Sequence, residues 1–595
     1  MSESAHRSPS TVPIQWQRRG AADSRSSGER SPPPGGGWRN YLAFSVLAIP
    51  IVLIVVLGWT QRWMSDDGFI SVRVVHQIFA GTGPVFNAGE RVEATTSPLW
   101  LLFLVIGRVL FFRLPVEWVA VLLGMSTTVA AVALTLLGAA RVHRTWRLLP
   151  IGIVAYAVLP PAAAFATAGL ETGLTLLWIV GWFLLLLRAS DQPQSRAVIV
   201  AAFTLGLGPL IRPDLAVMSV LGGVTLAVLS RPTGRRSCIA IITWALVLPA
   251  TYELFRMCYY GNLLPNPAYA KEATASNWTQ GWEYLKDFNR PYWVWVPALV
   301  CMVAAAVTWG HVRGAMRRLV LATPAAAGLV YGFFIVRGGG DFMHARMLLP
   351  AVFALQLPVA AVPLRRSTLA LLTLTVVWAA VPLAAGGPPY SGIGPHGITN
   401  ERAFYASKLG NPVTLDDYTS RGLVSLGRAA RTRSESGQRF VEQFLLTGSV
   451  SQPLDPRAPA FVQHGVYAIG AIGMASVAAG TDVYIVDHFG LASPIGSRLE
   501  ITNPRRRPGH EKFLRPSWIF AMFGDPQAPA PRGVSANEIR DARKALGCAA
   551  IQQMLQRGRE PLTLRRMALN VAESFTAFST RIDPDPAKEL QRCSH

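Results

Sequence analysis

Charged residues are scarce in this chain of 595 residues: Asp, Glu, Lys and Arg together make up 15%, against 51% hydrophobic residues. A soluble protein of this length can bury a large core, but it does not need so many long apolar runs. The mean hydropathy of +0.31 also lies on the apolar side. The lack of charge therefore argues against a soluble protein and indicates one that lies largely in a membrane.

Cysteines are also few, and their positions divide them into two groups. Cys238, Cys258 and Cys301 lie in or beside apolar runs, where a thiol is a small apolar filler. Cys548 and Cys593 lie in the more polar last third of the chain. They can pair if that part faces an oxidising compartment, but the sequence does not fix their distance and leaves the bridge open.

Acidic residues are fewer than basic ones, 34 against 56, which gives a net charge of +22. Such an excess can indicate nucleic-acid binding, but here the arginines collect in short loops between apolar runs, such as Arg141–Arg147 and Arg231–Arg236. Basic loops of this kind stay on the cytoplasmic side of a membrane. We therefore expect a lipid bilayer and no nucleic acid as the partner.

Apolar runs close to the length that crosses a bilayer fill residues 41–385. There are eleven of them: Tyr41–Trp59, Val116–Ala140, Leu149–Ala164, Thr172–Leu187, Val198–Ile211, Asp214–Ser230, Cys238–Phe255, Trp293–Trp309, Leu319–Val336, Met347–Pro363 and Ser367–Ala385. Pro98–Phe112 is apolar too, but counting it as a span would put a basic loop outside, so we interpret it as an interfacial helix. The prediction is a mainly α, polytopic domain with about 11 transmembrane helices.

The composition of the N-terminal tail and the number of spans predict on which side of the membrane each end of the chain lies. Residues 1–40 carry six arginines against three acids, and no small-residue cleavage site follows the first run, so we predict a disordered, basic, cytoplasmic tail. Eleven crossings then place the first loop, residues 60–97, and the long segment 386–595 on the outer, periplasmic side. Gly480–Leu491 alternates like a strand and 535–547 has the caps of a helix, which predicts an α/β domain there.

The predicted outer turns hold more ionisable side chains than turns need. They are Asp66, Asp67, Glu90, Arg91, Glu93, Glu171, Arg212, Asp214, Lys271, Glu272, Asp341, His344 and Arg346. Each alone can be a surface charge at the end of a span, and the two adjacent aspartates can simply favour the start of a helix. Two carboxylates held together can instead poise one of them as a base.

Several short motifs around these residues resemble the GT-C membrane glycosyltransferases. The motifs are DDGFIS (66–71), FNAGERVEATTSPLW (86–100), GLET (169–172), RPD (212–214), YYGNLLPN (259–266) and GGDFMHAR (339–346). With the RRRPGHEK stretch (505–512), the chain is similar to the AftB-type β-(1→2) arabinofuranosyltransferases of actinobacteria. The resemblance runs from about residue 41 to the C-terminus.

The resemblance implies transfer of arabinofuranose from decaprenyl-phosphoryl-arabinose to the ends of arabinan in arabinogalactan and lipoarabinomannan, with retention of configuration. Asp66 and Asp67 would be catalytic, with their division into base and nucleophile left open. We expect Arg212, Lys271, His344 and Arg346 to bind the donor phosphate, and Glu171, Asn262 and Asp341 to bind sugar hydroxyls. Glu93, Asp214 and His510 complete the expected substrate-binding set.

Other interpretations stay open at this level. A GT-C enzyme can use another polyprenyl-phosphate sugar such as mannose, and a lipid-linked saccharide transporter would also have many spans. A transporter would place ionisable groups at mid-membrane, whereas here they lie at span ends. No cofactor is implied; a divalent metal is left open, and no metal ligands are predicted because no tight ligand spacing occurs. The domain 386–595 would either bind the acceptor or cap the membrane domain.

Overall fold

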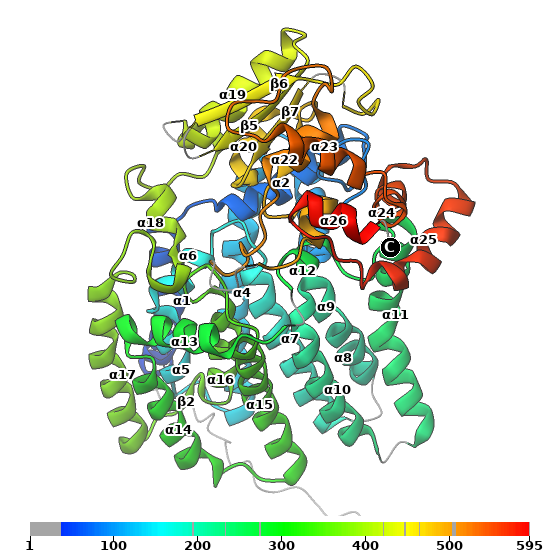
Figure 1. Cartoon of the computed structure of the whole chain (residues 1–595). Helices are drawn as coiled ribbons and strands as arrows, with labels where there is room; N and C mark the ends of the chain where they lie inside the picture. The colour runs from blue at the N-terminus through cyan, green and yellow to red at the C-terminus, as the bar shows by residue number, and fades with distance from the viewer. Residues whose placement is uncertain are drawn as a thin grey trace, which may run out of the picture.

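The computed structural model describes residues 37–593, apart from 193–195, 232–233, 273–274, 420–421, 446–447, 463–464 and 503–506. The tail predicted for residues 1–40 therefore lies outside the described residues except for its last four. Two layers make up the described part: a layer of long helices, and a C-terminal unit that covers one of its faces (Figure 1).

Every predicted apolar run is helical in the first layer. These helices are α1 (Gly37–Thr60), α4 (Val116–His143), α5 (Ile151–Ala157), α6 (Pro160–Phe165), α7 (Thr172–Asp191), α8 (Arg196–Gly206), α9 (Gly208–Ile211), α10 (Ala216–Ser230), α11 (Arg235–Tyr260), α14 (Trp295–Trp309), α15 (Ala315–Arg337), α16 (Leu349–Gln356) and α17 (Arg366–Ala385). The mainly α class is thus confirmed.

Not all of these helices have the length of a full span. Six described helices are long and apolar enough to cross a membrane, or seven if α14 and the preceding α13 (Trp278–Tyr292), bent by 85°, count as one span. Of the other predicted spans, the first lies in α1, which has 24 residues, whereas the runs 149–164 and 198–211 are each divided into two helices, with Pro160 and Pro209 in the first turn of the second helix. The structure shows several apolar spans, and the count of eleven stays a prediction.

Two shorter helices lie at the face where the two layers meet, α2 (Asp66–Phe79) and α12 (Asn266–Ala270). A third, α3 (Pro98–Leu110), packs against α2, α4 and α9. Ser65 caps α2, because its Oγ accepts the Gly68 N–H at 3.1 Å and donates to the Ala168 carbonyl at 2.8 Å. The second bond ties the start of α2 to the turn before α7. The first half of the predicted external loop 60–97 is therefore the helix α2, and most side chains of α2 are buried beneath the C-terminal unit.

The C-terminal unit is built on a four-stranded sheet with the order β6-β5-β7-β8. Its strands are β5 (Phe440–Leu445), β6 (Gly448–Pro453), β7 (Gly465–Ile469) and β8 (Tyr484–Asp487). The pair β5–β6 is antiparallel, whereas β5–β7 and β7–β8 are parallel. The strand predicted within 480–491 is confirmed as β8, and the capped helix as α23 (Ala536–Ala545), whose Ser535 side chain accepts the Glu538 N–H.

Helices cover both faces of this sheet. On one face, Tyr467 and Ile469 share a core with α20 (Ile472–Ala479) and with α2. On the other face, Val466 and Ala468 share a core with α22 (Pro516–Phe523) and α23. Successive side chains of β7 point to opposite faces of the sheet. Because α2 packs on one of these faces, it contributes to the core of the C-terminal unit.

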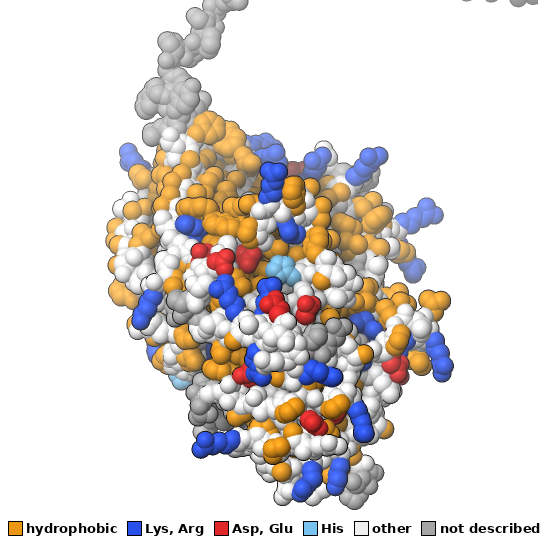
Figure 2. Space-filling view, turned by 90° about the horizontal axis from the view of Figure 1, so that it is seen from above, with side chains coloured by type: hydrophobic (Ala, Val, Ile, Leu, Met, Phe, Trp, Pro, Cys, Tyr) orange, Lys and Arg blue, Asp and Glu red, His pale blue; other side chains and the backbone are white. Residues whose placement is uncertain are grey.

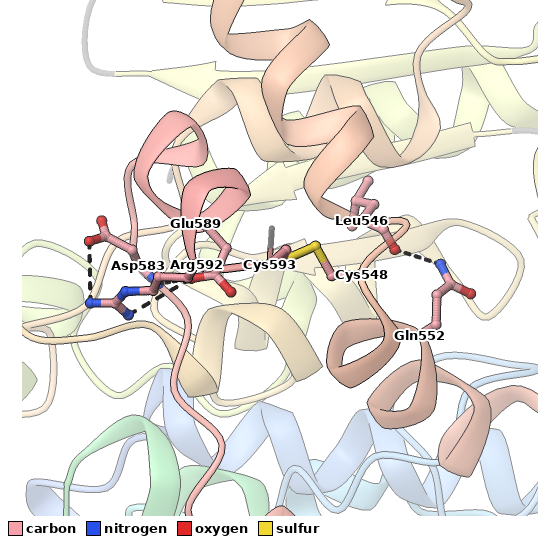
Figure 3. Close-up of a disulfide and its surroundings, with 7 residues drawn as sticks. All are labelled: Leu546, Cys548, Gln552, Asp583, Glu589, Arg592 and Cys593. Carbon is pink, nitrogen blue, oxygen red and sulfur yellow. Dashed lines mark hydrogen bonds and ion pairs between the residues drawn. A yellow bond between two sulfur atoms is a disulfide. The ribbon is translucent and has the colours of Figure 1, made fainter. Parts of the chain in front are cut away.

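Cys548 and Cys593 form a disulfide with a Cα–Cα distance of 5.8 Å (Figure 3). The bond joins the start of α24 (Ala549–Arg559) to the end of α26 (Pro586–Cys593), 45 residues further along the chain. Arg592, beside it, lies 3.7 Å from the Asp583 carboxylate and 3.9 Å from that of Glu589. The bridge that the sequence left open therefore fixes the last helix onto the unit.

Replacing Cys593 with serine should lower the free energy of unfolding of the C-terminal unit by about 2–4 kcal/mol, because an intact bridge restricts the unfolded chain. Chemical denaturation of the full protein in detergent, followed by pulse proteolysis of this unit, measures the change. Cys238→Ser is the control, since Cys238 is a free cysteine in the helical layer. Equal stability of the wild type and the Cys593→Ser variant would contradict the prediction.

Candidate active site between the two layers

Two adjoining cavities lie where the helical layer meets the C-terminal unit. The first, about 410 Å³, is named here the arginine cavity, and it is lined by Glu171, Arg212, Asp214, Asp341 and Arg346. The second, about 350 Å³, is named the His510 cavity, and it is lined by Asp66, Phe342, Glu401, Phe489, Arg507 and His510. Asp67, Ile70, Lys271 and Leu491 line both, so the two cavities share one wall.

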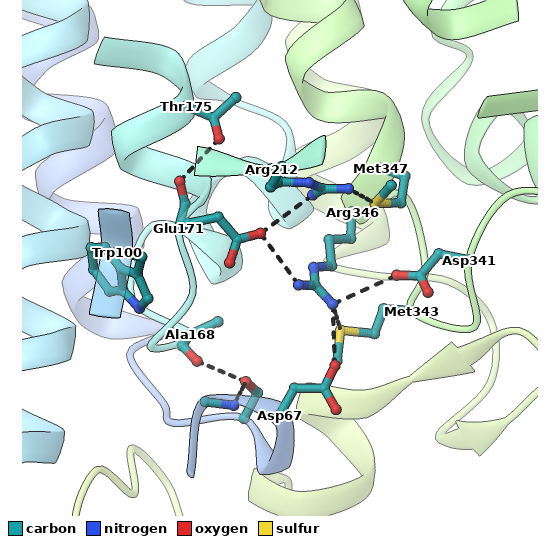
Figure 4. A network of polar contacts seen from close by, with 12 residues as sticks. Asp67, Trp100, Ala168, Glu171, Thr175, Arg212, Asp341, Met343, Arg346 and Met347 are labelled. Atoms are coloured by element: carbon teal, nitrogen blue, oxygen red, sulfur yellow. Dashed lines mark hydrogen bonds and ion pairs between the residues drawn. The ribbon is translucent and has the colours of Figure 1, made fainter. Parts of the chain in front are cut away.

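Arg212 lies in the break between α9 and the short helix Pro213–Leu215, where its backbone is extended. Its guanidinium donates to both carboxylate oxygens of Asp214, at 3.0 and 3.1 Å. A third donor reaches Glu171, the residue before α7, at 3.4 Å (Figure 4). The RPD and GLET motifs therefore meet in space, and their charges are buried and paired.

Arg346 continues this network toward α2. Its guanidinium lies 3.4 Å from Glu171, 3.3 Å from Asp67 and 3.8 Å from Asp341 (Figure 4). Among the described residues its Nε has no hydrogen-bond partner, so one donor of the fork is unused. Glu171 thus bridges the two arginines, and each arginine has a further acid beside it, Asp214 for Arg212 and Asp341 for Arg346.

The adjacent aspartates 66 and 67 have different environments. Asp66 is buried, and its carboxylate accepts the N–H groups of Gly473 and Met474, at 3.1 and 2.8 Å, in the first turn of α20. Burial raises the pKa of Asp66 to about 6, although these two bonds act in the opposite direction. Asp67 is more exposed and faces the shared wall, where it pairs with Arg346.

The contact at Asp66 requires a glycine in α20. A Cβ atom built on Gly473 would lie 1.8 Å from the backbone oxygen of Asp66. No side chain fits there without moving one of the two layers. Asp66 and Gly473 therefore set the distance between the helical layer and the C-terminal unit at this point.

The His510 cavity is lined by aromatic rings and by cations. The His510 ring packs edge to face against Phe489 and Phe342, with centroids 4.5 and 4.9 Å apart. Burial, together with nearby Arg507, lowers the pKa of His510 to about 3, so the ring is uncharged at neutral pH. Lys271 and Arg507 lie over the Phe342 ring at 5.5 and 4.5 Å. The structure therefore brings the predicted residues Lys271 and His510 together.

Glu401 is a residue of this site that the sequence did not suggest. It is the first residue of α18 (Glu401–Ala406), its side chain is buried, and within the described ranges its Oε2 has no hydrogen-bond partner. Burial, followed by the charges of Asp67 and Asp66, raises the pKa of Glu401 well above its ordinary value. Asn400 before it signals the start of a helix, but no pattern indicates that the acid after this cap points toward α2.

Three residues predicted to bind substrate, His344, Asn262 and Glu93, line neither of these two cavities in the structure, and their role in binding stays a prediction. His344 contacts Asp287 and Tyr292 through its two ring nitrogens, at 2.5 and 3.1 Å. It lines a separate cavity of about 420 Å³, of which Glu401 is also a wall. Motif membership placed His344 near Arg346, but the left-handed backbone of the intervening Ala345 separates the two side chains.

Asn262 and Glu93 are the other two, and both make structural contacts. The Asn262 side-chain oxygen accepts a bond from Arg498 at 2.7 Å, which joins the helical layer to the C-terminal unit. Glu93 accepts bonds from Arg256 and Tyr252, both at 2.7 Å, which join the first loop to α11. In this structure both side chains are thus engaged by neighbouring residues.

The outer surface of the C-terminal unit carries basic side chains interspersed with acidic ones (Figure 2). In the part of the chain that the structure describes, no three His, Cys, Asp or Glu side chains are grouped as metal ligands. The acids of the arginine cavity are instead paired with arginines. The candidate site therefore combines buried arginine–carboxylate pairs on one side of Asp67 with aromatic rings, neutral His510 and the cation Arg507 on the other.

Comparison with known proteins gives two kinds of match. The sequence pattern of the AftB family C-terminal domain matches residues 457–592. The terminal β-(1→2)-arabinofuranosyltransferase of Corynebacterium glutamicum is 33% identical, over 96% of this chain and 90% of that protein. The protein of the same name from Mycobacterium tuberculosis is 33% identical, over 90% of this chain and 95% of its own length.

Glu401→Gln should match the wild type in stability near pH 4 and become the more stable of the two as the pH rises. An acid whose pKa is raised by folding loses stabilisation as the pH rises from its unfolded value, 4.5, through its folded value. Glutamine does not titrate and mimics the uncharged acid. Melting temperatures of both proteins at pH 5, 7 and 9 measure the difference, with exposed Glu435→Gln as the control. A difference that does not change with pH would contradict the prediction.

Proposed function

The chain belongs to the AftB family of terminal β-(1→2)-arabinofuranosyltransferases, and from this premise we propose that it transfers arabinofuranose from decaprenyl-phosphoryl-arabinose to the ends of cell-wall arabinan. One observation carries the assignment to this site. Among the described residues, Asp67 is the one carboxylate that lines both cavities. A donor in one cavity and an acceptor in the other would meet at its side chain.

The arginine cavity suits the lipid-linked donor. Arg212 and Arg346 offer planar guanidinium groups, and two oxygens of a phosphate can accept two parallel hydrogen bonds from such a group. Lys271, at the wall between the cavities, adds a further cation. Leu264 and Phe334 give the same cavity apolar walls for the first part of a polyprenyl chain. The acids paired with the arginines fix the orientation of both guanidinium groups before the donor binds. Less side-chain entropy is therefore lost on binding.

The His510 cavity suits the sugar acceptor. Phe489 is partly exposed there and offers an aromatic surface, whereas Tyr484 and Trp518, two other aromatic side chains of the C-terminal unit, are buried in its core. Neutral His510 and the Glu401 carboxyl group can exchange hydrogen bonds with hydroxyl groups. The C-terminal unit would thus bind arabinan as well as cover the membrane domain.

In the proposed reaction, Asp67 takes the proton of the acceptor hydroxyl as its oxygen forms the bond to the anomeric carbon. The bond from that carbon to the phosphate oxygen breaks, and the phosphate leaves with the electron pair, stabilised by the arginines. A β donor and a β product require retention, either by attack on the face of departure or through a glycosyl-enzyme on a carboxylate. Asp66 is a positioning residue in this scheme, because the first turn of α20 occupies its carboxylate.

We also propose that the site faces outward, with the N-terminus in the cytoplasm, about eleven crossings and residues 386–595 as a periplasmic domain. Two observations support this orientation. The arginine-rich segments lie at the ends of the helices away from the C-terminal unit, as at the end of α10 and the start of α11. The disulfide between Cys548 and Cys593 fits an oxidising compartment.

Purified protein incubated with decaprenyl-phosphoryl-arabinose and a short synthetic arabinan should give a product with a new terminal β-(1→2) linkage, detected by linkage analysis. Asp67→Asn should lower the transfer rate about 100- to 10,000-fold, because the base is lost. Asp416→Asn is the control, since the Asp416 side chain is 85% exposed.

A different linkage, or better use of a polyprenyl-phosphate mannose, would overturn the proposed substrates. Unchanged transfer by Asp67→Asn would overturn the proposed base while leaving the enzyme class intact.

Arg212→Lys or Arg346→Lys should raise the apparent Michaelis constant for the lipid donor several-fold and leave that for arabinan unchanged. Lysine keeps the charge but acts as a point donor, and it cannot contact both Glu171 and a second acid as each arginine does. Steady-state kinetics in detergent measure both constants, with exposed Arg318→Lys as the control. Wild-type donor kinetics in both variants would reduce these arginines to structural residues.

A further inference from the structure

Helix α25 (Leu564–Ala577), in the C-terminal unit, has its polar face buried and its apolar face exposed. Four side chains spaced along one side are buried: Arg566, Asn570, Ser574 and Ala577. The opposite side carries Leu564, Ala568, Val571, Phe575 and Phe578, at positions i, i+4, i+7, i+11 and i+14, which form one stripe along a helix. Leu564 is 86% exposed and Phe575 62% exposed.

Specific hydrogen bonds hold the polar face inward, so the orientation of the helix is fixed. The Arg566 guanidinium donates to Asn570 at 2.8 Å and to Glu560 at 3.2 Å, and it also contacts Glu573. Asn570 in turn donates to the carbonyl of Cys258 at 2.9 Å. Because these groups are satisfied only in this orientation, α25 cannot turn its apolar stripe toward the protein without leaving buried polar groups unpaired.

The bond to Cys258 places α25 beside the last turns of α11, which is itself a candidate membrane span (Figure 1). Only 6% of the apolar 18-residue stretch of α11 is buried inside the protein. The side chains of Leu254 and Phe255, near the end of this helix, are exposed. A helix of this kind faces lipid along most of its surface. The stripe of α25 therefore begins next to a surface that the bilayer already covers.

From this continuity we propose that α25 lies in the headgroup region of the leaflet on the side of the C-terminal unit, with its apolar stripe directed into the acyl chains. Amphipathic helices bind at this depth when they expose an apolar stripe and carry basic residues beside it. Arg565 is exposed beside the stripe and can contact lipid phosphate. The occupant of the stripe is a phospholipid surface, and this inference does not depend on which sugar the enzyme transfers.

The proposal can be tested with a fluorescent nitrobenzoxadiazole label on the full-length protein in vesicles of phosphatidylcholine and phosphatidylglycerol. The free cysteines are first replaced (Cys238→Ala, Cys258→Ala, Cys301→Ala), and the disulfide is kept. The label is attached at Phe575→Cys, with Ala536→Cys as the matched control, because Ala536 is an exposed helical position of the same unit. Phospholipids that carry a nitroxide near the headgroup serve as the quencher.

We expect these lipids to quench the label at position 575 several-fold more than the label at 536. Leu564→Cys should behave like Phe575→Cys, and because Leu564 is almost fully exposed, this second variant keeps the test informative if the first folds poorly. Equal quenching at 536 and 575, or a label at 575 that is reached by aqueous iodide, would overturn the proposal. A label shielded from both lipid and iodide would also overturn it, since a second copy of the chain would then cover the stripe.

Discussion

The carboxylate of Asp66 accepts two backbone N–H groups from the first turn of α20, and through this contact the C-terminal unit is held on the helical layer. The first turn of a helix presents unpaired N–H groups and a partial positive charge, so a buried carboxylate is stabilised there. Gly473 allows the backbones to approach closely enough for these bonds. The wall between the two cavities, with Asp67 as the next residue, depends on this approach.

The arginine cavity illustrates how a membrane enzyme can keep cations ready for an anionic ligand. A buried guanidinium without a partner would cost several kcal/mol, and the acids around Arg212 and Arg346 offset that cost. One donor, the Nε of Arg346, has no hydrogen-bond partner among the described residues. In the proposed scheme a phosphate would join an existing charge network and would not have to create one.

The sequence predicted the helices well, because a helix that crosses or lines a membrane needs an uninterrupted run of apolar residues, which is visible in the sequence itself. Motif resemblance also grouped Glu171, Arg212 and Arg346, which the structure brings into one cavity. It could not separate the tasks of Asp66 and Asp67, since their difference arises from partners about 280 to 410 residues away. Glu401 and the orientation of α25 were missed for the same reason: a residue's burial is set by contacts that local patterns do not encode.

The long separation between Asp66 and its partners also has a consequence for biosynthesis. Gly473 follows Asp66 by 407 residues. At about 5–20 residues per second, the ribosome takes about 20–80 s to make this stretch of chain. By the end of that interval every span can already be inserted, yet α20, whose first turn binds the Asp66 carboxylate, has not been synthesised. The centre between the layers can therefore form only after the ribosome has passed Gly473, and an enzyme truncated before that glycine would be inserted but incomplete.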